Sequence, residues 1–390
     1  MVIIGCDFHP SFQQVAIFDK QTGEIEEMRL SHPVEAEQFY RGLAGRSVRV
    51  GMEACGHYPW FERLLSELGQ ELWLGDAARI RASVVRQQKT DRRDAEQLLK
   101  LLREDRFPRI WVPSVEERDA RQLLIHRHQQ VQARTRVKNQ LQAMALGQGV
   151  QRQRKLWSRV GRAELEQLPL LPYAWQRRQQ LLQTLDRLDS EIAELQGRVE
   201  QEASQRPPVV KLMTHPGVGP VTALAMVLTI GPAQRFQSPR QVASYFGLIP
   251  SEHSSGGRQQ LGRISKQGNA FLRFLLVEAG QSAARHEAEL GRFYRRLSAR
   301  KHRALAKVAV ARKLAMRLYL MLREDWNYAQ LIRAVVQVGP ESFRGRTLGS
   351  TRCVGSLPPR TEWGVRSKNL GSDTGPMKWM AELQNHPPHD

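Results

Sequence analysis

The opening stretch VIIGCDFHPSFQQVAIFD, residues 2–19, decides the fold of the first part of the chain. It holds two β-rich runs, VIIGCD and QQVAIFD, joined by FHPS, and this pattern predicts a β-hairpin. Farther along, SVRVGME and ELWLGD are strand candidates, and PWFERLLSELG between them predicts an amphipathic helix with a glycine stop. DRRDAEQLLKLLRED predicts a closing helix. Residues 1–114 are therefore expected to form an α/β domain with a mixed sheet.

Residues 115–205 change to long helix rich in Gln and Arg. Apolar side chains there recur at alternating spacings of four and three, which is the a/d spacing of a coiled coil or a helical hairpin. These are Leu181, Leu185, Leu188, Ile192, Leu195 and Val199. Two arrangements fit this stripe equally well: pairing inside the chain with a helix over 116–146, or the seam of a dimer.

Residues 206–338 are expected to form a third, mostly helical unit. The remaining residues, 339–390, are rich in Gly, Ser, Thr, Arg and Pro without periodicity, which predicts a largely disordered or loosely attached tail. Within the third unit, HPGVGPVTALAMVLTIG (215–231) places Gly217 and Gly219 in a tight turn before an apolar helix. Such a helix-hairpin-helix-like turn can offer backbone N–H groups to a phosphate, although an ordinary turn between core helices fits as well.

The charge of the chain favours a polyanionic partner. The 390 residues carry 59 Lys and Arg against 39 Asp and Glu, a formal net charge of +20, and neutralising phosphates releases their counterions. Cys6, Cys55 and Cys353 have no paired spacing, which argues against a disulfide framework or a cysteine-based zinc site. We expect a cytoplasmic protein without a membrane span, because no apolar run approaches the ~18 residues that a span needs.

Four carboxylates form the candidate metal site. Asp7 ends the first strand candidate and Glu53 ends SVRVGME, and acids at the ends of buried strands are costly unless they pair or bind something. Asp91 and Asp94 are three apart, so they lie on one helical face. If these elements pack together, the four acids converge and repel each other, and one or two Mg²⁺ or Mn²⁺ ions would relieve that repulsion and support phosphoryl transfer. The alternative is a helix cap at Asp91, an ion pair of Asp94 with a nearby Arg, and a satisfied strand-end acid at Glu53.

The segment FGLIPSEHSSGGRQQLGRISKQGNAFLRFLL, residues 246–276, is a Gly/Ser-rich loop that leads into a helix. It carries Arg258, Arg263 and Lys266. A serine needs a base or a metal before it can act as a nucleophile, so Ser254 and Ser255 are, on chemistry alone, most often simple loop hydroxyls.

A strongly cationic helical stretch follows at residues 291–323, which hold eleven Lys and Arg and no acid. Apolar residues keep one helical face, so the other face is expected to be basic. Contact with a DNA or RNA backbone is preferred over a merely solvated basic face, and it should depend strongly on salt. The cations singled out for this contact are Arg295, Arg296, Arg300 and Lys301.

Several of these motifs together resemble a known family. An Asp in a first strand followed by a hairpin, a Glu 46 residues later, and KTDRRDA (89–95) resemble the DEDD-type transposases of the insertion-sequence one-ten family. Residues 246–276 resemble the C-terminal domain of that family, in which a GLxPS…SG…ISKxGNxxLR pattern surrounds a serine. Ser255, just before Gly256, matches that serine, with Ser251 and Ser254 as the other choices. The HSSGG run is similar to the eleven-eleven subgroup.

The resemblance implies a RuvC-like domain of the RNase-H type in which Asp7, Glu53, Asp91 and Asp94 hold the metal. It implies that Ser255 attacks DNA and forms a covalent link, and that an element-encoded guide RNA is a second partner. Arg263 and Lys266 would stabilise phosphate charge, and the helical stripe makes a dimer or tetramer with shared sites reasonable. The predicted function is thus a DNA transposase or recombinase that cuts and rejoins insertion-sequence ends. A hydrolytic nuclease of the Holliday-junction type and an inactive nucleic-acid-binding descendant are the alternatives.

Overall fold

The computed structural model describes residues 1–83, 90–151, 155–252 and 260–338, with side chains described as far as residue 334. Ser254, Ser255, Arg258, Cys353 and the predicted tail over 339–390 lie outside these ranges.

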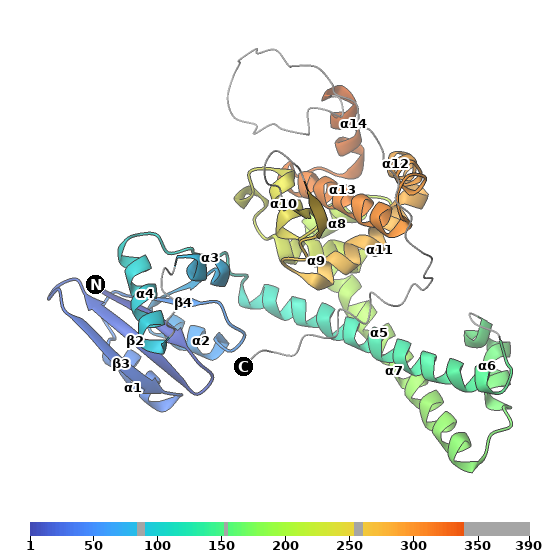
Figure 1. Cartoon of the computed structure of the whole chain (residues 1–390), viewed down its shortest axis with the longest axis horizontal. Coiled ribbons are helices and arrows are strands. Elements are labelled where there is room, and N and C mark those ends of the chain that lie inside the picture. The colour runs from blue at the N-terminus through green and yellow to red at the C-terminus, as the bar shows by residue number, and fades with distance from the viewer. Residues whose placement is uncertain (84–89, 152–154, 253–259, 339–390) are drawn as a thin grey trace. The chain divides into compact units, whose positions relative to one another are not determined.

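A five-stranded mixed sheet forms the centre of the N-terminal part, in the order β3-β2-β1-β4-β5 (Figure 1). β2 is antiparallel to both β1 and β3, whereas β4 is parallel to its two neighbours, β1 and β5. The predicted hairpin is present as β1 and β2, and the two later strand candidates are β4 and β5. The strands are β1 Val2–Phe8, β2 Phe12–Asp19, β3 Ile25–Ser31, β4 Val48–Glu53 and β5 Glu71–Gly75.

Helices cover both faces of this sheet. Alternate side chains of β1 explain the arrangement, because Val2, Ile4 and Cys6 pack with α1 and α2 while Ile3 packs with α3 and α4. Two separate apolar clusters result, one for each face. The helices are α1 Val34–Gly42, α2 Pro59–Glu67, α3 Ala77–Ala82 and α4 Asp91–Arg103. The predicted α/β character of this part is confirmed.

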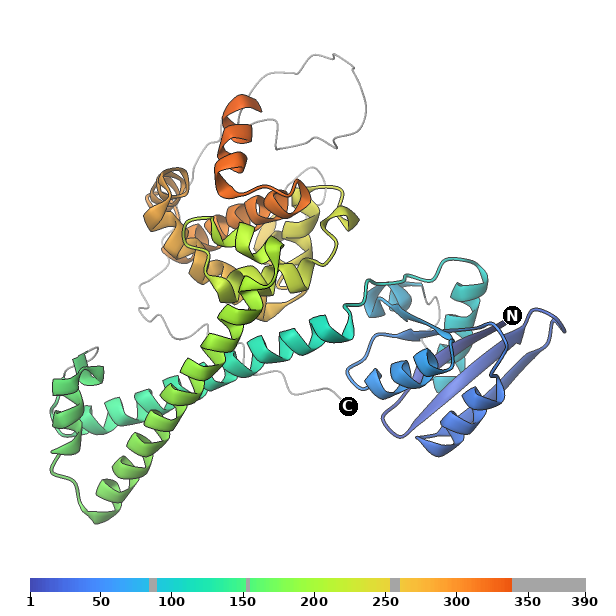
Figure 2. The same cartoon turned by 180° about the vertical axis from the view of Figure 1, so that it is seen from behind.

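Two long helices follow, α5 (Val115–Gly147) and α7 (Pro172–Ser204), and they pack along each other (Figures 1 and 2). α5 begins with a capping box, in which Ser114 and Glu117 each bond the backbone of the other. The short helices η1 (Lys155–Trp157) and α6 (Arg159–Glu166) lie between them in sequence.

The predicted stripe on α7 is largely buried in this helical hairpin. The buried members are Leu185, Leu188, Ile192 and Val199, while Leu181 and Leu195 are half-buried and Leu182 is buried in place of Leu181. A straight helix of 3.6 residues per turn drifts away from a strict seven-residue repeat, so the buried face moves along the stripe. The pairing inside the chain is thus the arrangement present here, and association between copies stays a prediction.

The remainder of the described chain is mostly helical, as predicted. Its core is built around α9, α11 and α13, which bury Leu224, Leu276 and Leu314 completely. The only β-structure in 206–338, within the described residues, is a short antiparallel pair, β6 (Pro250–Glu252) and β7 (Leu261–Ile264). The helices are α8 Pro207–Met213, α9 Pro220–Ile230, η2 Ala233–Arg235, α10 Pro239–Tyr245, α11 Ala270–His286, α12 Ala288–Ser298, α13 Arg303–Arg323 and α14 Tyr328–Val338. Among the described helices, none combines the length and the apolar character needed to cross a bilayer.

Candidate metal centre and phosphate-binding segment

Neighbouring parallel strands place two of the predicted acids at the same edge of the sheet. Asp7 is the penultimate residue of β1 and Glu53 is the last residue of β4. Cys6 pairs with Met52 in the register of these strands, so the two acids follow side by side. Because side chains alternate along a strand, Asp7 lies on the same face as Gly5, and Glu53 on the same face as Gly51.

Both glycines lie beneath α4, and this explains how the helix reaches the acids. A Cβ on Gly5 would lie 2.3 Å from the carbonyl oxygen of Ala95 and from the backbone nitrogen of Leu99. A Cβ on Gly51 would lie 2.7 Å from a methyl carbon of Leu102. Only glycine permits such a close approach of helix to strand. The first turn of α4, with Asp91 and Asp94, is consequently held at the carboxyl end of β1.

The start of α4 is electrostatically suited to a cluster of acids. Thr90 caps the helix by accepting a hydrogen bond from the backbone N–H of Arg93. The free N–H groups of the first turn give this end of the helix a partial positive charge, which stabilises carboxylates nearby.

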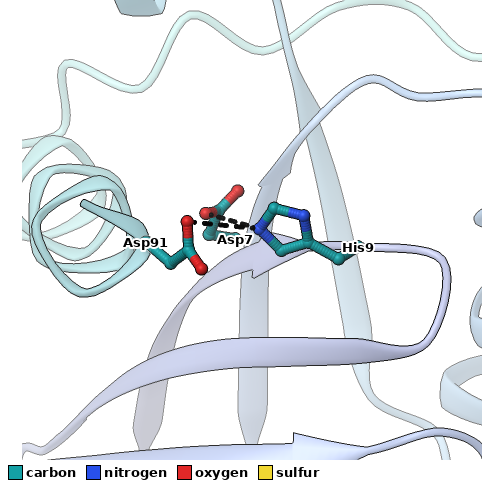
Figure 3. Close-up of side chains that lie close together, drawn as sticks. All are labelled: Asp7, His9 and Asp91. Carbon is teal, nitrogen blue, oxygen red and sulfur yellow. Dashed lines mark hydrogen bonds and ion pairs between the residues drawn. The ribbon is translucent and has the colours of Figure 1, made fainter. Parts of the chain in front are cut away.

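Asp7, His9 and Asp91 come together at this point (Figure 3). His9 Nε2 lies 3.1 Å from Asp7 Oδ2 and 3.6 Å from Asp91 Oδ1. One potential ligand atom from each of the three residues lies within 4.8 Å of the others, which would allow a shared metal ion. Carboxylate oxygens are hard donors that fit Mg²⁺ or Mn²⁺.

The Asp7 carboxyl is placed where a free negative charge is disfavoured. Burial raises its pKa, the contact with His9 lowers it, and the charges of Asp94 and Asp91 raise it, with a net upward shift. Half-buried and facing two other acids, this carboxylate would be stabilised by a divalent cation.

Glu53 and Asp94 are near the cluster but are not among its three grouped ligands. Glu53 Oε1 lies 3.4 Å from the guanidinium of the exposed Arg81 on α3. Asp94 acts on Asp7 through its charge. Of the four predicted acids, Asp7 and Asp91 are grouped around His9. Asp94 is close enough to influence the pKa of Asp7, and Glu53 forms an ion pair with Arg81.

His9 was missed by the sequence reasoning. A signal existed: in DFHP the histidine follows Asp7 by two residues, so both side chains leave the strand on the same side. The turn that follows makes this alternation hard to extrapolate from sequence.

In the C-terminal part, the predicted glycine turn joins α8 to α9. Gly217 has φ +85°, and a Cβ there would lie 2.3 Å from the backbone nitrogen of Ala283 on α11. Gly219 is the N-cap of α9, and the space around its missing Cβ is open. Gly217 is thus required for packing inside the protein, while Gly219 is the glycine with room for a ligand.

His215 contacts the same turn through its buried ring. Its ring is buried, packs edge-on against Tyr328 at 4.8 Å and lies with Nδ1 2.9 Å from the Pro216 carbonyl oxygen. Burial lowers the pKa of His215 from 6.5 to about 4. Nearby, the guanidinium of Arg317 is buried and pairs with Glu287 and Glu289. This cation of the basic stretch therefore forms ion pairs inside the protein and does not face solvent.

The serine segment connects β6 and β7, and Ser255 and Arg258 lie in it outside the described residues. Ser251 is described, and its hydroxyl donates to the carbonyl of Arg263 at 3.1 Å. Arg263 is exposed on β7. Lys266 is exposed as well and has φ +56°, a conformation uncommon for a residue with a side chain.

Arg273, the last residue of the SKQGNAFLR run, holds the base of this hairpin. Its buried guanidinium donates to the carbonyl oxygens of Phe246, Gln267 and Gly268. Asn269 caps α11 by accepting from the N–H of Leu272. The sequence motif therefore anchors the residues that flank the β6–β7 pair, and the sequence alone did not identify Arg273 in this role.

The cations predicted to contact nucleic acid on α12 and just after it are all exposed. They are Arg295, Arg296, Arg300 and Lys301. By contrast, Lys313 of the same basic stretch pairs with Glu289.

Comparisons with known proteins agree with these motifs. A model described as "Transposase", for the DEDD transposases of the IS110 type, matches residues 4–148, and the model "Transposase IS116/IS110/IS902 family" matches residues 210–295. A DEDD transposase domain implies an RNase-H-like fold, with which the mixed sheet agrees.

Curated relatives extend the similarity over most of the chain. A probable family 20 transposase of Pseudomonas aeruginosa is 28% identical over 339 residues, which cover 83% of this chain and 98% of the relative. The transposase for insertion sequence element IS1111A of Coxiella burnetii is 27% identical over 73% of this chain and 78% of its own. The transposase for IS1328 of Yersinia enterocolitica is 28% identical over 68% and 81%. Family models match both the N-terminal acid-bearing segment and the C-terminal segment, and the relatives align with most of the chain. The chain therefore belongs to the IS110 family of transposases.

Proposed function

We propose that this transposase cuts and rejoins the DNA ends of its own insertion sequence by phosphoryl transfer at a divalent cation held by Asp7, Glu53, Asp91 and Asp94. The observation that carries the proposal is the approach of Asp7 and Asp91 beside the first turn of α4, where two acids and a histidine point at one place. Bound there, Mg²⁺ or Mn²⁺ would supply charge neutralisation at the scissile phosphate. Glu53 follows Asp7 on the neighbouring strand, and its partner Arg81 is exposed, so we propose that Glu53 exchanges this ion pair for the cation.

The nucleophile in this proposal is the hydroxyl of Ser255. Its oxygen bonds to the scissile phosphorus as the bond from phosphorus to the bridging sugar oxygen breaks, giving a phosphoserine link to one DNA end. The hydroxyl proton passes to a base and the departing sugar oxygen takes up a proton. Ser251 is a weaker choice because its hydroxyl is bonded within the β6–β7 pair.

The phosphate contacts are assigned to the glycine turn and the exposed cations. Gly219, at the start of α9, would offer backbone N–H groups, and Gly217 would shape the turn. Arg258, Arg263 and Lys266 would stabilise charge near the reacting phosphate. Arg295, Arg296, Arg300 and Lys301 would bind the nucleic-acid backbone.

Three further proposals accompany this one. By resemblance to the family, a guide RNA encoded by the element would select the DNA. The helical stripe on α7 makes assembly as a dimer or tetramer reasonable, and the cysteine usage fits a reaction in the cytoplasm. The units would be a catalytic domain over 1–114, the helical region over 115–205 and the serine-containing domain over 206–338.

To test this proposal, the protein is expressed in cells that also carry a plasmid with the insertion sequence that encodes it. DNA that remains attached to the protein after detergent denaturation is measured along with rejoined ends. We expect Ser255→Ala to lose the attached DNA, Asp7→Asn to lose both products by about a thousandfold, and Ser251→Ala to keep both.

The other outcomes identify the alternatives. Cut DNA without any attached protein indicates hydrolysis of the junction-nuclease kind. Attached DNA that persists in Ser255→Ala excludes this serine, and products unchanged in Asp7→Asn exclude the carboxylate site.

A further inference from the structure

We infer that His9 is a further ligand of the divalent cation and determines which metal the carboxylate site selects. This inference rests on the proposed cation site at Asp7 and Asp91. Figure 3 shows the His9 ring directed with one nitrogen toward both carboxylates, and that nitrogen, Nε2, lies 3.1 Å from Asp7 and 3.6 Å from Asp91.

These separations are those of neighbouring ligands around one ion. Two donors that are each about 2.1 Å from a cation and at right angles to it lie about 3.0 Å apart. The His9–Asp7 and His9–Asp91 separations need little or no adjustment to meet this value. Without an ion, the same approach is a hydrogen bond between His9 and Asp7.

The imidazole is oriented by groups other than the acids. The backbone N–H of His9 donates to the carbonyl of Phe12 at 2.9 Å, which closes the β1–β2 turn. The His9 ring stacks on the Phe12 ring at 4.5 Å with an interplanar angle of 17°. The guanidinium of Arg29 lies 3.7 Å above the same phenyl ring. A ligand held in this way loses little freedom when an ion binds.

A nitrogen donor changes the metal preference of a site otherwise made of carboxylates. Mg²⁺ prefers oxygen ligands, whereas imidazole binds transition-metal ions better. With His9 in the ligand set, the site prefers Mn²⁺ over Mg²⁺. A variant of this chain with an oxygen ligand at position 9 would then prefer Mg²⁺ more strongly.

The test is pulsed electron paramagnetic resonance on the full chain loaded with Mn²⁺. A directly bound imidazole gives a ¹⁴N coupling to the Mn²⁺ signal. We expect this coupling in the original chain, its loss in His9→Ala, and its retention in the control His57→Ala, an exposed histidine in the segment that follows Glu53. In parallel titrations, His9→Ala should weaken Mn²⁺ binding on the order of tenfold, by analogy with the loss of a supporting residue at a metal site. Mg²⁺ binding should change less, and His9→Asp should favour Mg²⁺.

The results separate this inference from the proposed function. Mn²⁺ that binds, is lost in Asp7→Asn and shows no ¹⁴N coupling leaves the carboxylate site intact and removes His9 from it. A coupling that persists in His9→Ala overturns the assignment in the same way. Mn²⁺ binding that is indifferent to Asp7→Asn contradicts the cation site itself.

Discussion

The carboxylate site and the residues that flank the serine segment are held in place in different ways. Asp7 and Asp91 occupy the end of a strand and the start of a helix, and Gly5 fixes the spacing between those two elements. The serine segment is a connection between two short strands, and a buried side chain, Arg273, ties down its base. Backbone packing thus positions Asp7 and Asp91, whereas the hydrogen bonds of one side chain hold the described residues on either side of the β6–β7 pair.

The strongest challenge to this contrast is Gly5→Ala. The new methyl group would meet two backbone atoms of α4 at 2.3 Å, so the helix must move. We expect a loss of about 3 kcal/mol in the free energy of unfolding, together with loss of Mn²⁺ binding. Gly56→Ala is the matched control, because its Cβ meets open space. A stable Gly5→Ala that binds Mn²⁺ normally would show that α4 is not positioned by this contact.

The two regions should also respond to pH with opposite sign. His215 has a pKa lowered from 6.5 to about 4, so the folded C-terminal part holds it neutral while the unfolded chain takes up a proton. Stability there should fall by about 3 kcal/mol as pH drops from 6.5 to 4. Asp7 has a raised pKa, so the folded protein binds its proton more tightly than the unfolded chain does. The stability of the N-terminal part should therefore fall as the pH rises through the pKa of Asp7.

Hydrogen exchange of amides in α9 and in β1, measured at pH 7 and pH 4, separates the two trends. His215→Asn should remove the acid sensitivity of α9 while its amide retains a donor for Pro216. Equal pH dependence of α9 in the original chain and in His215→Asn contradicts the assignment.

Arg273→Met isolates the support of the serine segment. Three carbonyl oxygens lose their partner, so the C-terminal part should lose about 2 kcal/mol, and the amount of DNA attached to the protein should fall by more than tenfold. Mn²⁺ binding at the N-terminal acids should not change. Arg285→Met, an exposed position on the same helix, serves as the control. An equal loss in both variants would assign the effect to charge rather than to the loop.

The smallest effect concerns the exposed cations after α11. Replacing Arg295 by Gln should lower the slope of log affinity for DNA against log salt by about 0.9, the value for one lost phosphate contact. Arg187→Gln on α7, an exposed arginine beside Glu191, should leave the slope unchanged. A slope that does not change in Arg295→Gln removes this residue from the interface.

The sequence was sufficient for features that repeat with a simple period or occupy ends of elements. The β1–β2 hairpin, α4 and the paired long helices follow from such patterns. Asp7 near the end of β1, and Asp91 and Asp94 in the first turn of α4, were predicted together with these elements. The edge strand β3 was not predicted, because IEEMRLS places charges among its apolar residues, as exposed edge strands commonly do. Contacts between distant residues, such as Gly5 with Leu99 or Arg273 with Phe246, leave no local pattern. The ion pair of Glu53 with Arg81 likewise joins residues 28 positions apart, so no local pattern predicts it.

The packing of α4 on β1 also limits how an inactivated copy could regain activity. An acid at position 5 would collide with the helix, and acids at positions 6 and 8 would emerge on the opposite face of the sheet. An acid at position 5, 6 or 8 can therefore not substitute for Asp7. A copy of the element that loses this residue would recover by reversion rather than by an acid at one of these three positions.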